Sequence, residues 1–178
     1  MRYLLIIASI GFLASCSPKL TPFTQDLYDQ NRWSEQELKK IQFYLSEDII
    51  LRRQYKEGES TIAGGKIRMV DGREVEEIIF RKGTPGVLLF TPRTNRFAIS
   101  FESNGEDRYL MFGPNPKAGD RYVLLAKDWD RRTGRVSYDD KVYTTTSSSA
   151  FSHLLVDLRR INKLEVERRT AGGRTIDN

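Results

Sequence analysis

From about residue 48 onward, apolar and polar residues alternate with a period of two, and this alternation constrains the fold most. The β-branched and aromatic runs are separated by turn residues such as Thr84-Pro85-Gly86 and Asn104-Gly105. A period of two is typical of strands with one buried face. Short strands broken by turns every ~10 to 20 residues favour antiparallel pairing over parallel βαβ units. We therefore expect a mainly β fold with an N-terminal helix, arranged as a small antiparallel β-barrel or sandwich.

The pattern defines ten candidate strands. They cover residues 49–55, 66–70, 74–81, 87–91, 96–102, 108–113, 122–127, 134–138, 141–145 and 164–169. The dipeptides Asp71-Gly72 and Asp139-Asp140 predict two tight hairpins between neighbouring candidates. Segment 147–163 fits a helix or a strand. We favour a strand over 153–158, because this stretch is short, apolar on both faces and surrounded by β-rich sequence.

A helix is predicted over residues 35–45. Ser34 and Glu37 have the spacing of a capping box at its start. Leu38, Ile41 and Leu45 recur at intervals of three and four, which gives one apolar stripe. We expect the stripe to cover one end or edge of the sheet, with a partner-binding helix as the alternative.

The chain opens on a charged and then apolar segment. Residues 3–13 form an apolar run behind a single arginine, and the run ends in Leu13, Ala14, Ser15 and Cys16, the only cysteine of the chain. A membrane-spanning helix needs about 20 apolar residues, so this run is too short. Its parts are those of an export signal. The tetrapeptide resembles the lipobox of bacterial lipoproteins.

That resemblance implies a specific modification and address. In this family the signal is cut between Ser15 and Cys16, and Cys16 then carries a diacylglycerol thioether and an acylated amino terminus. Ser17, where the family places aspartate for inner-membrane retention, implies transport to the outer membrane. We therefore expect a lipid anchor in the bacterial cell envelope and no other cofactor. Without the signal, 163 residues remain with a net charge of +4.

The domain organisation follows from these features. Residues 1–15 are the expected signal peptide, 16–32 a lipid-anchored tether, and 33–178 a single β-rich globular domain with an N-terminal helix. The tether contains two prolines and no sustained period. Its apolar side chains are the exception, and we expect them to dock on the domain's own surface or on a partner. They are Leu20, Phe23, Leu27 and Tyr28.

The sequence offers little catalytic or metal-binding chemistry. Ser152, His153 and Asp157 are too close in sequence to converge as a triad, which separate loops normally assemble. A single histidine and no free thiol exclude a typical zinc site. Four aspartates lie near two turns: Asp128, Asp130, Asp139 and Asp140. Paired carboxylates can hold calcium or do acid–base work, but aspartate is an ordinary turn residue, and we interpret these as turns.

Six basic residues gather near the C-terminus, against three acidic ones. They are Arg159, Arg160, Lys163, Arg168, Arg169 and Arg174. Such a cluster can contact anionic lipid head groups or acidic cell-wall polymers. The alternative is a solvated strand face with alternating charges. Nucleic acid is not expected as a partner, because an exported domain does not meet it.

Three functions remain open at this point. The first is a non-enzymatic interaction or accessory module at the outer membrane, as part of a larger protein complex. The second is a carrier for a lipid or small hydrophobic ligand, with a cavity lined by aromatic side chains. These would be Phe97, Phe101, Tyr109 and Phe112. The third is an envelope hydrolase that uses two loop carboxylates. We favour the first.

Overall fold

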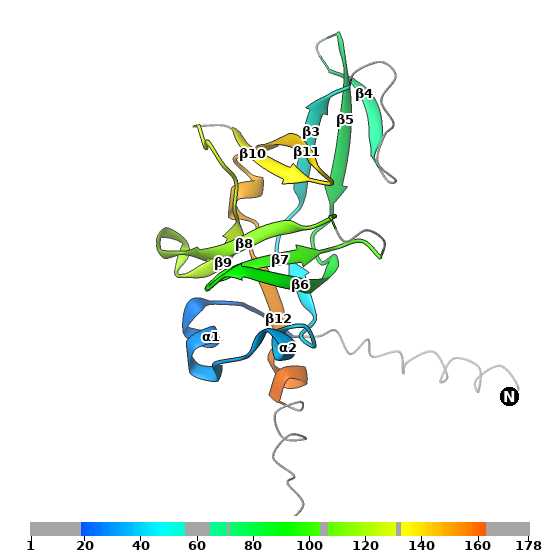
Figure 1. Cartoon of the computed structure of the whole chain (residues 1–178). Helices are drawn as coiled ribbons and strands as arrows, with labels where there is room; N and C mark the ends of the chain where they lie inside the picture. The colour runs from blue at the N-terminus through cyan, green and yellow to red at the C-terminus, as the bar shows by residue number, and fades with distance from the viewer. Residues whose placement is uncertain (1–18, 56–64, 71, 104–106, 131–132, 163–178) are drawn as a thin grey trace, which may run out of the picture.

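The chain folds into two antiparallel sheets, as seen in a computed structural model that describes residues 19–55, 65–70, 72–103, 107–130 and 133–162 (Figure 1). The seven-stranded sheet has the order β1-β12-β2-β6-β7-β8-β9. Its strands are β1 Leu20–Pro22, β2 Phe43–Leu45, β6 Pro85–Arg93, β7 Arg96–Ser100, β8 Leu110–Asn115, β9 Arg121–Leu124 and β12 Leu154–Asp157. The expectation of a mainly β fold is thus confirmed.

The second sheet has five strands in the order β10-β11-β3-β5-β4. These strands are β3 Ile49–Gln54, β4 Lys66–Val70, β5 Arg73–Phe80, β10 Thr133–Tyr138 and β11 Lys141–Thr146. The helical elements are short: α1 Gln25–Asn31, α2 Glu35–Leu38 and the 3₁₀ turns η2 Pro116–Ala118 and η3 Ser149–Phe151. Figure 1 places β4 and β5 at one end of the molecule and α1 and α2 at the other.

Most of the expected strands are present, with ends that shift by up to three residues. The strand expected over 153–158 is β12, so the strand interpretation of that segment is confirmed, and a helical turn follows at residues 158–162. The candidate at 164–169 lies outside the described residues. The pattern did not predict β1 and β2, which are only three residues long.

Both predicted hairpins are confirmed. In β4 and β5, Val70 pairs with Arg73, and in β10 and β11, Tyr138 pairs with Lys141, so two residues connect each pair. Asp139 and Asp140 have φ values of 50° and 56°. Two consecutive left-handed residues form the type I′ turn, whose twist matches that of the flanking strands.

The helix predicted over 35–45 is wrong beyond its first turn. The capping box is present, since Ser34 Oγ accepts from the amide of Glu37 and the Glu37 carboxylate accepts from the amide of Ser34. The helix ends at Leu38, however, and β2 begins at Phe43. Phe43 and Leu45 are both buried, whereas Tyr44 between them is not, which is the period of a strand. Pairing with β12 and β6 therefore overrides the helical spacing.

The tether expected over 16–32 also differs from the structure. Residues 20–31 form β1 and α1, and Phe23 between them is fully buried. Its ring lies 5.0 to 5.9 Å from the rings of four aromatic side chains, Trp33, Phe43, Phe97 and Tyr122. This segment docks on the domain because burying one phenylalanine among such rings is worth several kcal/mol, about 3 or more.

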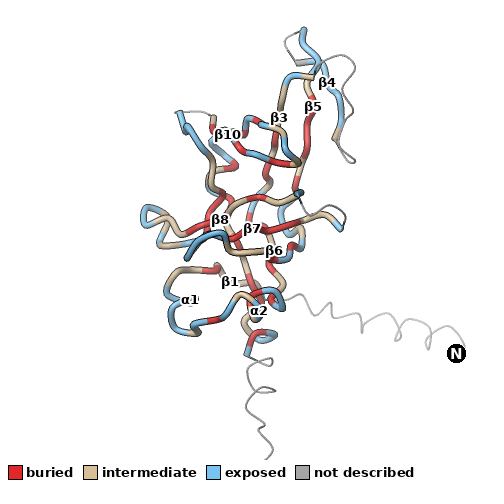
Figure 2. The backbone as a smooth tube through the Cα atoms, viewed as in Figure 1, coloured by how far each residue is buried: buried red, intermediate tan, exposed pale blue. Residues whose placement is uncertain are grey.

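One cluster of buried hydrophobic residues contains side chains from both sheets (Figure 2). Phe80 of β5 contacts Phe101, next to β7, at 5.8 Å between ring centroids, and Tyr138 of β10 at 5.4 Å. Phe101 in turn contacts Phe112 of β8 at 6.0 Å. These rings join the cores of the two sheets, so the sheets share one interior.

A substitution at Gly86 in β6 can test how tightly this core is packed. A methyl group at this position would lie 2.5 Å from the ring of Phe101 and 2.8 Å from Ile99. We expect Gly86→Ala to lower the free energy of unfolding by about 2 kcal/mol, because the core must shift to admit it. The neighbouring exposed Val87 is the control, with Val87→Ala expected within about 0.5 kcal/mol of the wild type. Denaturant titration measures both, and equal losses would contradict the tight contact.

Glu35 links α2 to β6 and gives a pH prediction. Its carboxylate accepts hydrogen bonds from the hydroxyl of Thr91 and, at 3.0 Å, from the amide of Thr91. It also forms an ion pair with Lys39 at 2.9 Å. These hydrogen bonds, that of the Thr91 hydroxyl first, lower the pKa of Glu35 from 4.5 to about 2. Stability from this contact is complete above pH 4.5 and is lost as the pH falls towards 2.

We expect Thr91→Val to raise the pKa of Glu35 towards 4.5, because the hydroxyl donor is removed. NMR titration of the side-chain carboxyl carbon measures the change. Thr144→Val, an exposed threonine on the other sheet, is the control and leaves the Glu35 curve unchanged. An unchanged titration curve of Glu35 in Thr91→Val would show that the Thr91 amide and Lys39 are sufficient to lower the pKa of Glu35.

Candidate functional site

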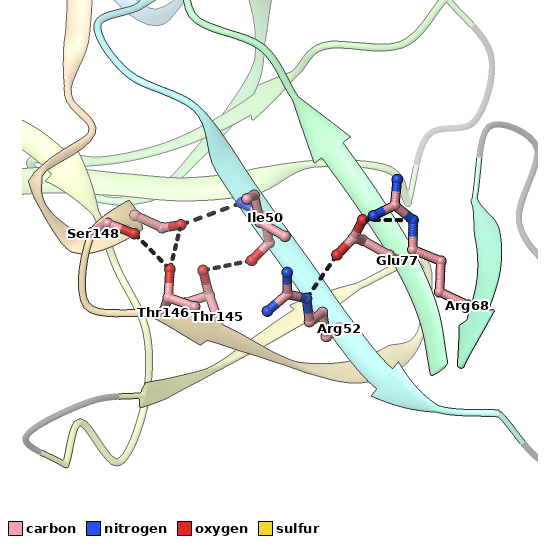
Figure 3. A network of polar contacts seen from close by, with 8 residues as sticks. Ile50, Arg52, Arg68, Glu77, Thr145, Thr146 and Ser148 are labelled. Carbon is pink, nitrogen blue, oxygen red and sulfur yellow. Dashed lines mark hydrogen bonds and ion pairs between the residues drawn. The ribbon is translucent and has the colours of Figure 1, made fainter. Parts of the chain in front are cut away.

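Charged side chains form a ladder across one face of the five-stranded sheet (Figure 3). The register places Arg52 of β3 directly opposite Glu77 of β5. Arg52 Nε donates to Glu77 Oε2 at 2.7 Å, and Arg68 of β4 reaches Glu77 Oε1 at 3.3 Å. The Glu77 side chain is only 4% exposed. One carboxylate therefore joins the strands on both sides of β5.

Hydroxyl groups form a second set of hydrogen bonds, which connects β3 to β11 and to η3. Thr145 Oγ1 donates to the carbonyl of Ile50 at 2.9 Å, and the amide of Ile50 donates to Ser149 Oγ at 3.2 Å. Thr146 and Ser148 share a hydroxyl contact of 2.7 Å in the same turn (Figure 3). These bonds fix η3 and the end of β11 against β3, so their visible role is to hold the sheet together.

The opposite face of the same strands contains a buried ion pair. Glu76 is fully buried, and it accepts from Arg53 Nε at 2.5 Å and from the hydroxyl of Tyr143 at 3.2 Å. The Arg53 guanidinium lies 5.8 Å from the centroid of the Tyr143 ring. Burial raises the pKa of Tyr143 to about 12, so the phenol stays a neutral donor at physiological pH. Opposite charges and a hydrogen bond compensate the burial of Glu76.

Sequence reasoning missed this pair of carboxylates. The available signal was the acidic doublet Glu76-Glu77 directly before the apolar run 78–80, together with the basic doublet Arg52-Arg53 in the neighbouring strand of the sheet. Adjacent residues of a strand point to opposite faces, so two antiparallel doublets in register give one ion pair on each face. Because each of these charged groups already has a partner within the sheet, we interpret them as structural contacts.

Beyond the ion pairs, the end strand β4 exposes apolar side chains. Ile67 is 45% and Met69 66% exposed, and both lie on the face that carries Glu76. Lys66 and Arg68 alternate with them on the other face. Larger contiguous apolar patches mark surfaces that contact other proteins, and these two side chains are the exposed apolar pair on β4.

The three residues with the composition of a catalytic triad are not arranged as one. Ser152 Oγ donates to the carbonyl of Glu47 at 2.9 Å, and Asp157 accepts from the amide of Arg159 at 3.1 Å. His153 Nδ1 lies 2.9 Å from Ser46 Oγ. Burial lowers the pKa of His153, which favours the neutral ring. Ser152, His153 and Asp157 thus make three separate structural contacts.

The four turn aspartates also have separate environments. Asp128 pairs with Arg135, and Asp139 accepts from Arg108 Nε at 3.2 Å. Asp130 accepts from the Thr133 amide at 2.6 Å, which closes its own turn. Asp140 is in the left-handed hairpin turn. In the described part of the chain, no group of three or more metal-ligating side chains comes together.

The aromatic side chains expected to line a carrier's cavity pack against other rings. Phe97 contacts Tyr122 at 4.7 Å, and Phe101 contacts Phe112 at 6.0 Å between centroids. Tyr109 contacts Phe90 at 5.0 Å. Phe97 and Phe112 are fully buried. Phe97, Phe101 and Phe112 thus belong to the packed core, whereas Tyr109 is half-buried outside it.

Two of the six predicted basic residues, Arg159 and Arg160, lie within the described residues, at one end of the seven-stranded sheet. β1 pairs antiparallel with β12, and Leu20 lies opposite Asp157. The chain before Leu20 and the chain after Asp157 therefore leave the sheet at the same end. Arg159 and Arg160 begin the helical turn there, at 3.6 and 4.0 Å from the Asp157 carboxylate. The other predicted residues lie outside the described residues: Ser15, Cys16, Lys163, Arg168, Arg169 and Arg174.

Comparisons with protein-family models, with curated proteins and with solved structures find no match to this chain. In the described ranges, no helix has the length and apolar character needed to cross a bilayer.

The buried ion pair generates a stability prediction. We expect Glu76→Gln to lower the free energy of unfolding by about 3 kcal/mol, because the buried Arg53 charge loses its opposite charge. The control is Glu47→Gln, which removes an exposed carboxylate 3.4 Å from Lys82 and is expected to cost at most about 0.5 kcal/mol. Denaturant unfolding of the two variants measures the difference. Similar values for both would contradict a structural role for Glu76.

Proposed function

We propose that this protein is a lipid-anchored, non-enzymatic interaction module at the outer membrane of a bacterial envelope, held there by acyl chains on Cys16. The observation that carries the proposal is the lipobox tetrapeptide behind a short apolar run. Two or more acyl chains give durable membrane attachment, whereas one gives only marginal binding. The folded part then acts from a fixed position beside the bilayer.

The beginning of β1 supports a close approach to the membrane. Leu20 is already paired in the sheet, and it follows Cys16 by four residues. Four extended residues span at most about 15 Å. The end of the sheet that contains β1 and β12 therefore faces the bilayer. Figure 1 shows β4 and β5 far from this end, so they would point away from the membrane.

We further propose that the two sheets form a sandwich and that the outer end carries the partner contact. The rings that join both sheets support the sandwich, because they fill the space between them. Exposed Ile67 and Met69 on β4 support the contact surface. The packed Phe97 and Phe112 give less support to a hydrophobic carrier, which needs an open cavity.

Mass spectrometry of the protein from its native host tests the anchor. We expect the mature chain to begin at Cys16 with a mass increase of a diacylglycerol and an acyl chain, and to sediment with outer membranes. Cys16→Ser should abolish the modification and leave the protein in the soluble fraction or unprocessed. The control is Ser17→Ala, which retains the thiol and should remain acylated. An unmodified Cys16 thiol in the wild type would overturn the proposal.

A further inference from the structure

We infer that Lys19, Arg159 and Arg160 form a binding surface for the phosphate groups of anionic lipids, directly beside the anchor. This inference rests on the proposed membrane attachment and adds a second, electrostatic contact to it. It names the surface of the domain that meets the bilayer and the chemistry that it meets there. We call these three residues the basic rim.

The topology brings the basic rim together. Lys19 precedes β1 and Arg159 follows β12 by two residues, and the pairing of Leu20 with Asp157 places both exits at one edge. The sequence alone does not reveal that the two segments leave the sheet at the same edge, because they are about 140 residues apart along the chain. The exit of the anchored segment and the arginines are thus parts of the same end of the fold.

The exposure of the side chains suits a surface contact. The side chain of Arg159 is 65% exposed and that of Arg160 is 70% exposed, whereas Asp157 between them is 6% exposed. Lys19 is also exposed. Asp157 contacts both guanidinium groups through Nε, and a guanidinium has five N–H donors, so each arginine retains donors that face solvent. Two guanidinium groups share this one carboxylate, so a net positive charge remains at this edge.

Guanidinium groups suit phosphate for a geometric reason. Their planar forks donate two parallel hydrogen bonds to phosphate oxygens, which a lysine does not do. The four-residue spacing keeps Leu20, which is paired with Asp157, within about 15 Å of the acylated residue. At physiological salt, interactions between exposed charges are largely screened beyond roughly 8 Å, so the basic rim gains only where this end of the fold lies against the head groups. This proximity favours lipid over a more distant cell-wall polymer as the partner.

Vesicle binding tests the basic rim apart from the anchor. The protein is the full mature chain, residues 16–178, with Cys16→Ser, so that no acyl chain contributes. Its partition onto vesicles of phosphatidylcholine with 30% phosphatidylglycerol is measured by co-sedimentation at low salt. Neutral phosphatidylcholine vesicles are the reference. We expect binding to the anionic vesicles at least fivefold above the reference, because each basic group near an anionic surface contributes about fivefold.

The decisive comparison uses two double variants with the same change of charge. Arg159→Gln with Arg160→Gln is expected to reduce binding to anionic vesicles by at least fivefold, and Lys19→Gln to reduce it further. The control is Arg81→Gln with Lys82→Gln, whose side chains are 71% and 65% exposed in a turn after β5. It should change binding less than twofold. Circular dichroism melting checks that both variants remain folded.

Three results would overturn the inference. They are equal losses in the two double variants, equal wild-type binding to neutral and anionic vesicles, and retention on purified cell-wall polymer without binding to anionic vesicles. The chain used here has no acyl group, so a negative result leaves the anchor standing. Conversely, an unmodified Cys16 in the native host would remove the anchor without changing vesicle binding.

Discussion

The burial of Phe23 is the contact on which the arrangement of this molecule depends. Phe23 lies between β1 and α1, and four aromatic rings surround it. Its amide also donates to the carbonyl of Leu154 at 2.8 Å, which continues the pairing of β1 with β12. Together these contacts fix the N-terminal segment on the seven-stranded sheet. Further contacts of the same segment reinforce this attachment: the amide of Gln25 donates to the carbonyl of Asp120 at 2.9 Å, and the ring of Tyr28 lies 5.7 Å from that of Phe97 between centroids.

The five-stranded sheet is held in a different way. Beyond the shared core, charged pairs replace apolar packing: Glu77 joins Arg52 and Arg68 on one face, and Glu76 joins Arg53 on the other. A buried ion pair adds little net stability compared with a well-packed apolar contact, but it penalises any register that leaves a charge unpaired. Because a one-residue slip moves every side chain to the other face, these pairs specify the register of β3, β4 and β5.

Local sequence signals correctly predicted those features of the fold that depend only on residues close together in the chain. Asp139-Asp140 predicted its hairpin because both residues tolerate left-handed backbone angles, and Ser34 with Glu37 predicted the start of α2. The end of α2 was not predictable, because Ile41 and Leu45 fit a helix equally well and only pairing with distant strands decides. The same holds for the edge where Leu20 pairs with Asp157, and for the pairing of the charged doublets. Each depends on contacts between segments that are far apart in the sequence.

The short distance between Cys16 and the first paired residue has a consequence for encounters with other molecules. On the proposed anchoring, the domain diffuses within a thin layer above the bilayer instead of exploring the volume of the periplasm. Neighbours anchored in the same layer would then meet it more often than they would if both diffused through the whole volume. On that proposal, contacts too weak to persist between freely diffusing proteins gain from this confinement, and the exposed Ile67 and Met69 are where such a contact would be sought.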